Sequence, residues 1–409
     1  MPGRAAIVAG CRTPFARAGT VYREMTAVDL ARACVRELVE RSEVDPAWVE
    51  TVVMGQVVAS PKAPNLAREV VLGAGLPVAT PAHTVNRACA SASQAIADVA
   101  SAILAGHATC GIAGGAESLS DPPILVGRGM RRALLEASRA KSLAGRLRPF
   151  LGLRPRDLAP DAPAIAEPST GLTMGQSAEK MAKENGVTRE EQDEIAWRSH
   201  VRAAAAANDG RIPAELARVF VPPKYEAVES DNLVRREATR EALAALPPVF
   251  DRRHGSVTAG NSSPLTDGAA AVLLMEEERA KALDYEPLAF IRSWAVAAVD
   301  PAGQLLMGPA VAVPKALERA GITLEEVDLV EMHEAFAAQV ASNSKALGGV
   351  HPDRLNVMGG SIALGHPFGA TGARLTTTLA NEMRRRGVRF GLVSVCAQGG
   401  MGFAMVLER

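Results

Sequence analysis

The feature of this sequence that most constrains its fold is an internal repeat. When the chain is shifted by 278 residues, the segment 44–54 lies over the segment 322–332 and is identical to it at three positions. At a shift of 281 residues, Gly106 lies over Gly387, and each glycine ends a predicted helix. Because the two matches keep their order and nearly the same offset, they indicate that the late half of the chain duplicates the early half.

Both halves alternate short apolar runs with longer helical patterns. The predicted strands are 5–9, 51–58 and 108–113 in the early half, and 326–332 and 389–396 in the late half. The predicted helices are 26–42 and 90–105 in the early half, and 308–320 and 371–386 in the late half. This alternation is typical of layered α/β domains with a mixed or parallel sheet.

The segment 119–251 separates the halves, holds many of the prolines and reads as an insertion that covers the sheet domains. Within it, 127–156 is strongly basic, and Leu143, Leu147, Phe150 and Leu151 are spaced for one helical face. Its nine basic residues, against the single acid Glu136, are Arg128, Arg131, Arg132, Arg139, Lys141, Arg146, Arg148, Arg154 and Arg156. This segment is either a solvated basic helix or a contact for an anionic ligand, an acidic partner or a lipid surface.

Composition excludes several function classes. Lysine plus arginine and aspartate plus glutamate both number 45, and aromatic residues make up 4%, a balance that disfavours a nucleic-acid binder. The longest uncharged stretches are broken by glycine, which argues against a membrane span, and the N-terminus lacks a secretory pattern. The five cysteines form no CxxC pair and no disulfide framework, so we expect a cytoplasmic protein.

The common nucleotide, zinc-protease and hydrolase motifs are absent, which leaves cysteines and histidines in special contexts. Cys89 lies just before the predicted helix 90–105, where the helix dipole should lower the pKa of its thiol, although a lone cysteine is more often buried and inert. His366 lies in a glycine-rich loop before the helix 371–386, near the repeat counterpart of Cys89. If the halves pack around a pseudo-two-fold axis, Cys89 and His366 meet there as a nucleophile–base pair.

Two further residues follow predicted strands. Cys396 ends the strand 389–396 and is followed by Gly399-Gly400, which suggests a proton-transfer group beside exposed backbone N–H groups, or else a core cysteine. His333 is a candidate hydrogen-bond donor after the strand 326–332.

These segments together resemble the thiolase family in order and over nearly the whole chain. The resemblance rests on five motifs: Arg12-Thr13-Pro14-Phe15, the segment from Asn86 to Ser91, the segment Thr258 to Ala270, the loop around His366 and the loop around Cys396. It implies two duplicated α/β halves that form a layered αβαβα core with an inserted loop domain. The implied division is 1–118 plus 252–283 for the N-terminal domain, 119–251 for the loop domain and 284–409 for the C-terminal domain.

The resemblance also implies roles for the candidate residues. Cys89 is the acyl-accepting nucleophile, His366 activates it and helps to bind the thioester oxygen, and Cys396 is the acid/base at the acetyl-CoA carbon. The backbone N–H groups of Cys89 and Gln398 form an oxyanion hole, and Ser263 contacts the pantetheine arm of CoA. Coenzyme A thioesters are substrates, and neither a metal nor another cofactor is expected.

Two departures from the common thiolase pattern bear on function. His333 stands where many thiolases have asparagine, and this His-Glu-Ala-Phe form resembles the β-subunits of fatty-acid β-oxidation (trifunctional) complexes. It favours cleavage of 3-ketoacyl-CoA over acetoacetyl-CoA synthesis by an acetyl-CoA acetyltransferase, while a non-catalytic scaffold subunit is a remote alternative. The other departure is Gln398, where glycine is common, so the geometry of its N–H is in question.

The expected partners follow in part from the same resemblance, which implies a homodimer or homotetramer and an α-subunit with hydratase and dehydrogenase activity as a candidate partner. The ratio of nine basic residues to one acid in 127–156 makes peripheral membrane contact through this segment a further candidate.

Overall fold

The computed structural model describes residues 3–161 and 166–409; residues 1–2 and 162–165, which fall in the predicted N-terminal and loop domains, lie outside the described residues. Its main element is a ten-stranded sheet with the path β12-β13-β14-β11-β1-β10-β5-β3-β4, and β2 (Ala16–Arg17) pairs with β10 beside this path. The early half contributes β1 (Ala5–Arg12), β3 (Thr51–Gly55), β4 (Ala82–Val85), β5 (Cys110–Glu117) and β10 (Thr266–Glu276). The late half contributes β11 (Ala289–Ala298), β12 (Leu329–Met332), β13 (Phe390–Ala397) and β14 (Met401–Glu408).

The strand order confirms the predicted duplication. The path β1-β10-β5-β3 of the early half repeats as β11-β14-β13-β12 in the late half, with one parallel pair in each, β3 with β5 and β12 with β13. β4 pairs with β3, and a parallel bridge between Val330 and Leu355 marks its counterpart beside β12. The halves join where β1 and β11 pair antiparallel through Ala6 and Ile7.

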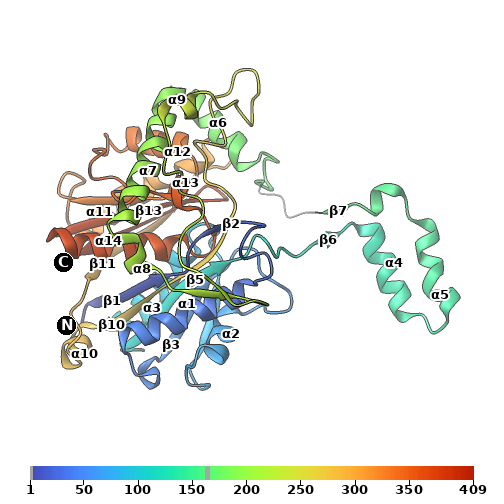
Figure 1. Ribbon diagram of the computed structural model, residues 1–409, viewed down its shortest axis with the longest axis horizontal. Helices are drawn as coiled ribbons and strands as arrows, with labels where there is room; N and C mark the ends of the chain where they lie inside the picture. Colours follow the sequence, from blue (N-terminus) through green and yellow to red (C-terminus); the bar gives the residue numbers. More distant parts are fainter. Residues whose placement is uncertain (1–2, 162–165) are drawn as a thin grey trace.

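The helices complete a layered αβαβα core (Figure 1). α3 (Ser91–Leu104) and α14 (Thr371–Arg386) pack against each other and form the central layer, and α14 contacts strands of both halves. α1 (Ala27–Ser42) and α2 (Leu66–Gly73) pack on the outer face of the early half, and α11 (Gly308–Ala320) and α12 (Ala337–Ala346) on the outer face of the late half.

The two central helices approach closely at their N-terminal ends. A Cβ atom on Gly372 would collide with Ser93, so only glycine allows this packing. The loops that precede the two helices are therefore held together at the centre of the molecule.

Part of the segment 119–251 covers the late half. α6 (Met174–Glu184) and α7 (Arg189–Asn208) pack on α12, and α7 also contacts α13 (Ser361–Leu364). The smaller elements of the body are α8 (Arg211–Glu215), β8 (Val219–Val221), β9 (Glu226–Val228), α9 (Arg240–Ala244) and α10 (Glu277–Ala282). The first motif is tied to this segment, because the buried Arg12 guanidinium donates to both carboxylate oxygens of Asp231 at 2.6 and 2.7 Å.

Residues 125–161 form an arm that extends away from the body (Figure 1). The arm contains β6 (Leu125–Val126), α4 (Arg128–Arg139), α5 (Leu143–Leu147), the 3₁₀ turns Arg148–Gly152 and Pro155–Asp157, and β7 (Pro160–Asp161). The apolar face predicted for a single helix from Leu143 to Leu151 is divided between α5 and a 3₁₀ turn, because Pro149 cannot continue the α-helical ladder. No helix among the described residues is long and apolar enough to cross a membrane.

Candidate active site

The Cys89 loop is a tight turn built by its own side chains. Asn86 Oδ1 accepts a hydrogen bond from the Ala88 N–H at 3.0 Å, and Ser91 Oγ accepts one from the Arg87 N–H at 2.8 Å. Ala88 is held in the left-handed region with φ of 45°, a conformation that strains an L-residue. Because such strain persists only where surrounding contacts enforce it, the motif from Asn86 to Ser91 serves to present Cys89 at the start of α3.

The expectation of a lowered pKa for Cys89 is wrong. Burial raises the pKa of this thiol to about 12, although the backbone N–H groups of Gln398 and of Cys89 itself act in the opposite direction. The loss of hydration of a thiolate thus outweighs the helix terminus and two amides. Cys89 is therefore a neutral thiol at rest, and its sulfur lies beside the two amides that the sequence suggested as an oxyanion hole.

The ring of His366 is held through Nδ1, which leaves Nε2 available as a base. Its Nδ1 lies 2.6 Å from Thr371 Oγ1, and the Thr371 hydroxyl donates to the Pro367 carbonyl at 3.0 Å. Since a carbonyl only accepts, Thr371 uses its proton there and accepts from Nδ1–H of His366. Nε2 therefore carries the lone pair, and burial lowers the pKa of His366 to about 3, which keeps the ring neutral.

The His333 ring is neutral too, and its contacts allow the tautomer opposite to that of His366. Its Nδ1 lies 2.9 Å from Ser361 Oγ, and the buried Arg374 guanidinium donates to the same oxygen at 3.0 Å. Arginine occupies one of the two acceptor sites of Ser361, and the hydroxyl can donate its proton to Nδ1 of His333, an arrangement that places the proton of the ring on Nε2. Burial, together with the neighbouring His366 and Arg374, lowers the pKa of His333 well below its usual range.

The two histidines and Cys89 converge. The ring centroids of His333 and His366 are 4.0 Å apart, and one ring nitrogen of each lies with Cys89 Sγ in a group whose members are within 4.8 Å of one another. Both Nε2 atoms are buried and lack a hydrogen-bond partner among the described residues. A thiol and two neutral imidazoles thus face one small space.

Cys396 completes the group at the end of β13. It is fully buried, and burial raises the pKa of its thiol well above the usual range, with the nearby Cys89 adding to the shift. The turn after it is held by the inserted segment, since Glu167 accepts from the Gly399 N–H at 2.9 Å and the Gln398 side chain donates to the Ala166 carbonyl at 2.8 Å. Only Gly399 and Gly400 in this turn have positive φ, so Gln398 fits without strain.

Ser263 lies at the edge of this group. Its backbone N–H and its hydroxyl both donate to the Ala335 carbonyl, at 2.9 and 3.1 Å, which ties it to the loop after His333. Leu265, two residues further along the chain, forms a bridge with His366. Ser263 therefore borders both histidine loops and is half-buried.

Sequence reasoning missed several residues that hold the site. The buried Glu117 carboxylate accepts from the N–H groups of Val57, Val58 and Gly369, each at 3.0 Å, and so ties the His366 loop to the early half. Burial raises the pKa of Glu117 to about 7. Glu334 similarly accepts from Ser199 and Asn356, both at 2.7 Å. Ser361 and Thr371 flank His366 in the glycine-rich motif, which was the one available signal for them.

A duplicated α/β core that brings two thiols and two neutral imidazoles to one point defines an acyltransferase of the thiolase type. The chain belongs to the thiolase family, because the family models for the thiolase N-terminal and C-terminal domains match residues 5–278 and 285–409.

Known proteins agree with this assignment. The chain is 53% identical to a 3-ketoacyl-CoA thiolase of Erwinia tasmaniensis, covering 99% of this chain and 96% of the relative. It is 51% identical to the enzyme of the same name from Serratia proteamaculans, covering 99% and 97%. At 34% identity and a TM-score of 0.87, its fold resembles the acetyl-CoA acetyltransferase of Bacillus anthracis and human mitochondrial 3-ketoacyl-CoA thiolase, each covering 99% of this chain and 98% of that chain.

Proposed function

We propose that this chain is a 3-ketoacyl-CoA thiolase, which uses CoA to cleave a 3-ketoacyl-CoA into acetyl-CoA and an acyl-CoA shortened by two carbons. The observation that carries the proposal is the convergence of Cys89 with two unpartnered imidazole nitrogens, beside Cys396. The relatives at 53% and 51% identity, all named 3-ketoacyl-CoA thiolase, support it.

In the first half-reaction, Cys89 Sγ attacks the 3-keto carbon while Nε2 of His366 takes the thiol proton. The N–H groups of Cys89 and Gln398 stabilise the oxyanion. The bond between C2 and C3 then breaks, its electron pair passes to the acetyl-CoA enolate, and Cys396 gives its proton to C2. Nε2–H of His333 and the protonated His366 donate to the thioester oxygen of this enolate, a use of neutral imidazole that suits an anionic oxygen in a dry site.

The second half-reaction transfers the acyl group. The Cys396 thiolate takes the proton of the CoA thiol, and the resulting CoA thiolate attacks the acyl–Cys89 thioester. His366 returns its proton to Cys89, and both thiols are restored. In this scheme Ser263 borders the pantetheine arm of CoA, and no metal or further cofactor takes part. The segments 1–118 plus 252–283 and 284–409 form the core that carries the site, and the segment 119–251 covers it.

The alternative is synthesis of acetoacetyl-CoA by the same residues, and the structural neighbours include enzymes of both names. A series of 3-ketoacyl-CoA substrates, from acetoacetyl-CoA to long chains, separates the two. We expect kcat/KM for thiolysis to be higher for longer chains than for acetoacetyl-CoA. A clear preference for acetoacetyl-CoA would favour the biosynthetic enzyme, and no turnover of any substrate would favour the scaffold subunit.

Substitution of Ser361 tests the tautomer of His333. Ser361→Ala removes the hydroxyl that donates to Nδ1 and leaves Arg374 without that acceptor. We expect kcat to fall by roughly tenfold with little change in KM, since a hydrogen bond aimed at the enolate is worth about 1–2 kcal/mol. Ser361→Thr keeps the hydroxyl and should retain most of kcat; equal losses in both variants would assign Ser361 a packing role only.

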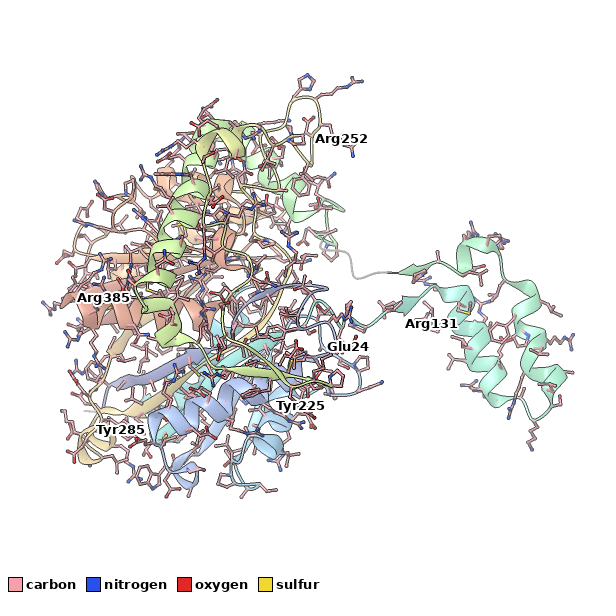
Figure 2. The ribbon with its side chains drawn as sticks, viewed as in Figure 1. Glu24, Arg131, Tyr225, Arg252, Tyr285 and Arg385 are labelled. Carbon is pink, nitrogen blue, oxygen red and sulfur yellow. The ribbon has the colours of Figure 1, made fainter. Side chains whose placement is uncertain are left out.

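The arm is proposed to contact an anionic lipid surface. Ala133 is the only buried residue of α4, while Leu134, Leu135, Leu143, Leu147 and Leu151 are exposed among the basic side chains. Figure 2 shows Arg131 on this arm, apart from the body. Exposed leucines combined with basic residues are the pattern of a helix that binds at the surface of an anionic membrane. We also propose a cytoplasmic homo-oligomer, with an α-subunit as the other occupant of the arm.

Neutralising the arm should weaken vesicle binding. The triple variant Arg128→Gln, Arg131→Gln, Arg132→Gln is expected to lose roughly 100-fold in affinity at low salt, since each basic residue near such a surface contributes about 1 kcal/mol. The assay is co-sedimentation with phosphatidylcholine vesicles that contain phosphatidylserine. Lys62→Gln, Arg252→Gln, Arg253→Gln removes the same charge from the body and should bind normally; Arg252 lies at a far loop in Figure 2. If the arm variant binds the vesicles as tightly as the unmodified protein does, the arm does not contact anionic lipid, and it contacts either an acidic partner or solvent alone.

A further inference from the structure

Cys89, His333 and His366 have the ligand chemistry of a transition-metal site. One sulfur and two imidazole nitrogens lie within 4.8 Å of one another. The Nδ1 atoms are engaged by Thr371 and Ser361, whereas both Nε2 atoms are buried, unpartnered and directed to the common space. Two buried ring nitrogens without a partner are the observation that points to a ligand, because buried polar atoms are normally satisfied.

We propose that these three side chains bind a zinc ion, as a Cys-His₂ site whose fourth position is open, and that the bound metal inhibits the enzyme. Thiolate and imidazole select zinc and related borderline metals over magnesium and calcium, which require oxygen ligands. Three protein ligands with an open position is a common zinc arrangement. Zinc binding does not rest on the proposed function; inhibition does, because it assumes that Cys89 is the nucleophile.

The geometry requires a small contraction. Bonds of about 2.3 Å to sulfur and about 2.0–2.1 Å to nitrogen place tetrahedral ligand atoms roughly 3.3–3.6 Å apart. The present separations of up to 4.8 Å must therefore shorten by up to roughly 1.2–1.5 Å, which side-chain rotation at Cys89 and tilting of the two rings can supply. The fourth position stays open to water, as in other zinc sites with three protein ligands.

Binding changes two protons. The Cys89 thiol releases its proton to solvent as sulfur bonds to zinc, and no electron is transferred. His333 must offer a lone pair at Nε2, so its proton moves to Nδ1, where Ser361 Oγ accepts it while still accepting from Arg374. The lone pair on Nε2 of His366 serves both as a base and as a metal ligand, so this ring needs no change of tautomer. His333 must change its tautomer to bind zinc.

The test is metal binding by the substrate-free protein. We expect one zinc per chain in a competition titration with a chromophoric chelator, and a cobalt complex with a sulfur-to-metal charge-transfer band. Cys89→Ala should abolish the band, and His333→Asn should weaken zinc binding by at least about tenfold, the minimum seen even for groups behind the ligands. His351→Asn makes the same substitution at an exposed histidine and should bind zinc normally.

A second measurement covers variants that fail to fold. In the unmodified protein, zinc should protect Cys89 from iodoacetamide, as read by mass spectrometry, and a chelator should restore alkylation. Zinc binding that persists in Cys89→Ala and His333→Asn, or alkylation unaffected by zinc, would overturn the proposal. Turnover by the metal-free enzyme is a separate result that bears on the proposed function alone.

Discussion

Cys89→Ala is expected to abolish acyl transfer while leaving the fold intact. The half-buried side chain contributes little packing, but its sulfur lies close to both a ring nitrogen of His366 and the Gln398 amide. We expect kcat/KM for thiolysis to fall by at least about 10⁴-fold, which is a typical loss when a covalent nucleophile is removed. This result is checked by the thiolysis rate, by thermal melting and by mass spectrometry. The mass of the acyl-enzyme should be absent from the variant.

A matched control is Cys110→Ala, which removes a different buried thiol from β5. It should lower stability through the small cavity it leaves, yet retain the acyl-enzyme and turnover. An equally active Cys89→Ala enzyme would contradict the assignment of the nucleophile, and no activity in the unmodified protein would favour the scaffold alternative.

The fold could be predicted largely because of the repeat. A shift of 278 carries β3 onto β12, and a shift of 281 carries α3 onto α14 to within a residue at each end, so the offsets located matching elements before their structure was known. The pairing of β1 with β11 could not be predicted, since two residue pairs leave no pattern in the sequence. α4 lies within 127–156, for which a solvated basic helix was one of the interpretations, but the sequence did not indicate where that helix begins and ends.

The candidate site, like the fold, could be predicted only in part. The meeting of Cys89 with His366 followed from the symmetry of the halves, because each lies in a loop before a central helix. The direction of the Cys89 pKa shift could not be predicted, since burial is a property of the whole fold and here exceeds the effect of the helix terminus. The tautomers depend on which hydroxyl already gives its proton elsewhere, and the partners of Ser361 and Thr371 are visible only in three dimensions.

In the proposed mechanism, two neutral histidines in opposite tautomers have different tasks. There His366 offers a lone pair to the thiol and His333 offers a proton to the enolate, although burial lowers both pKa values for the same reason. The difference arises from what lies behind each ring, a hydroxyl bound to a carbonyl for His366 and a hydroxyl bound to a guanidinium for His333. A site of this kind gains acid and base functions at neutral pH without charging either ring.

Cys396→Ala is expected to separate carbon–carbon cleavage from acyl exchange. The enolate carbon needs a positioned acid, and in the proposed mechanism the buried Cys396 thiol is that acid, so we expect thiolysis of a 3-ketoacyl-CoA to fall by about 10²–10⁴-fold. Exchange of the acyl group between acyl-CoA and free CoA breaks no carbon–carbon bond. Near pH 8.5, about the pKa of an ordinary thiol, CoA ionises without help, and exchange should therefore persist.

Cys396→Ser is the control that separates acidity from packing. Serine matches cysteine in shape and fills the end of β13, but its hydroxyl is a far weaker acid than a thiol. If Cys396 acts as the acid, the serine and alanine variants lose cleavage alike, keep exchange at alkaline pH and still form the acyl-enzyme on Cys89. Normal cleavage in Cys396→Ser would contradict that role, because the side chain would then only fill space. The proton for C2 would come from another group, and His366, which takes a proton from Cys89 in the preceding step of the proposed mechanism, is a candidate.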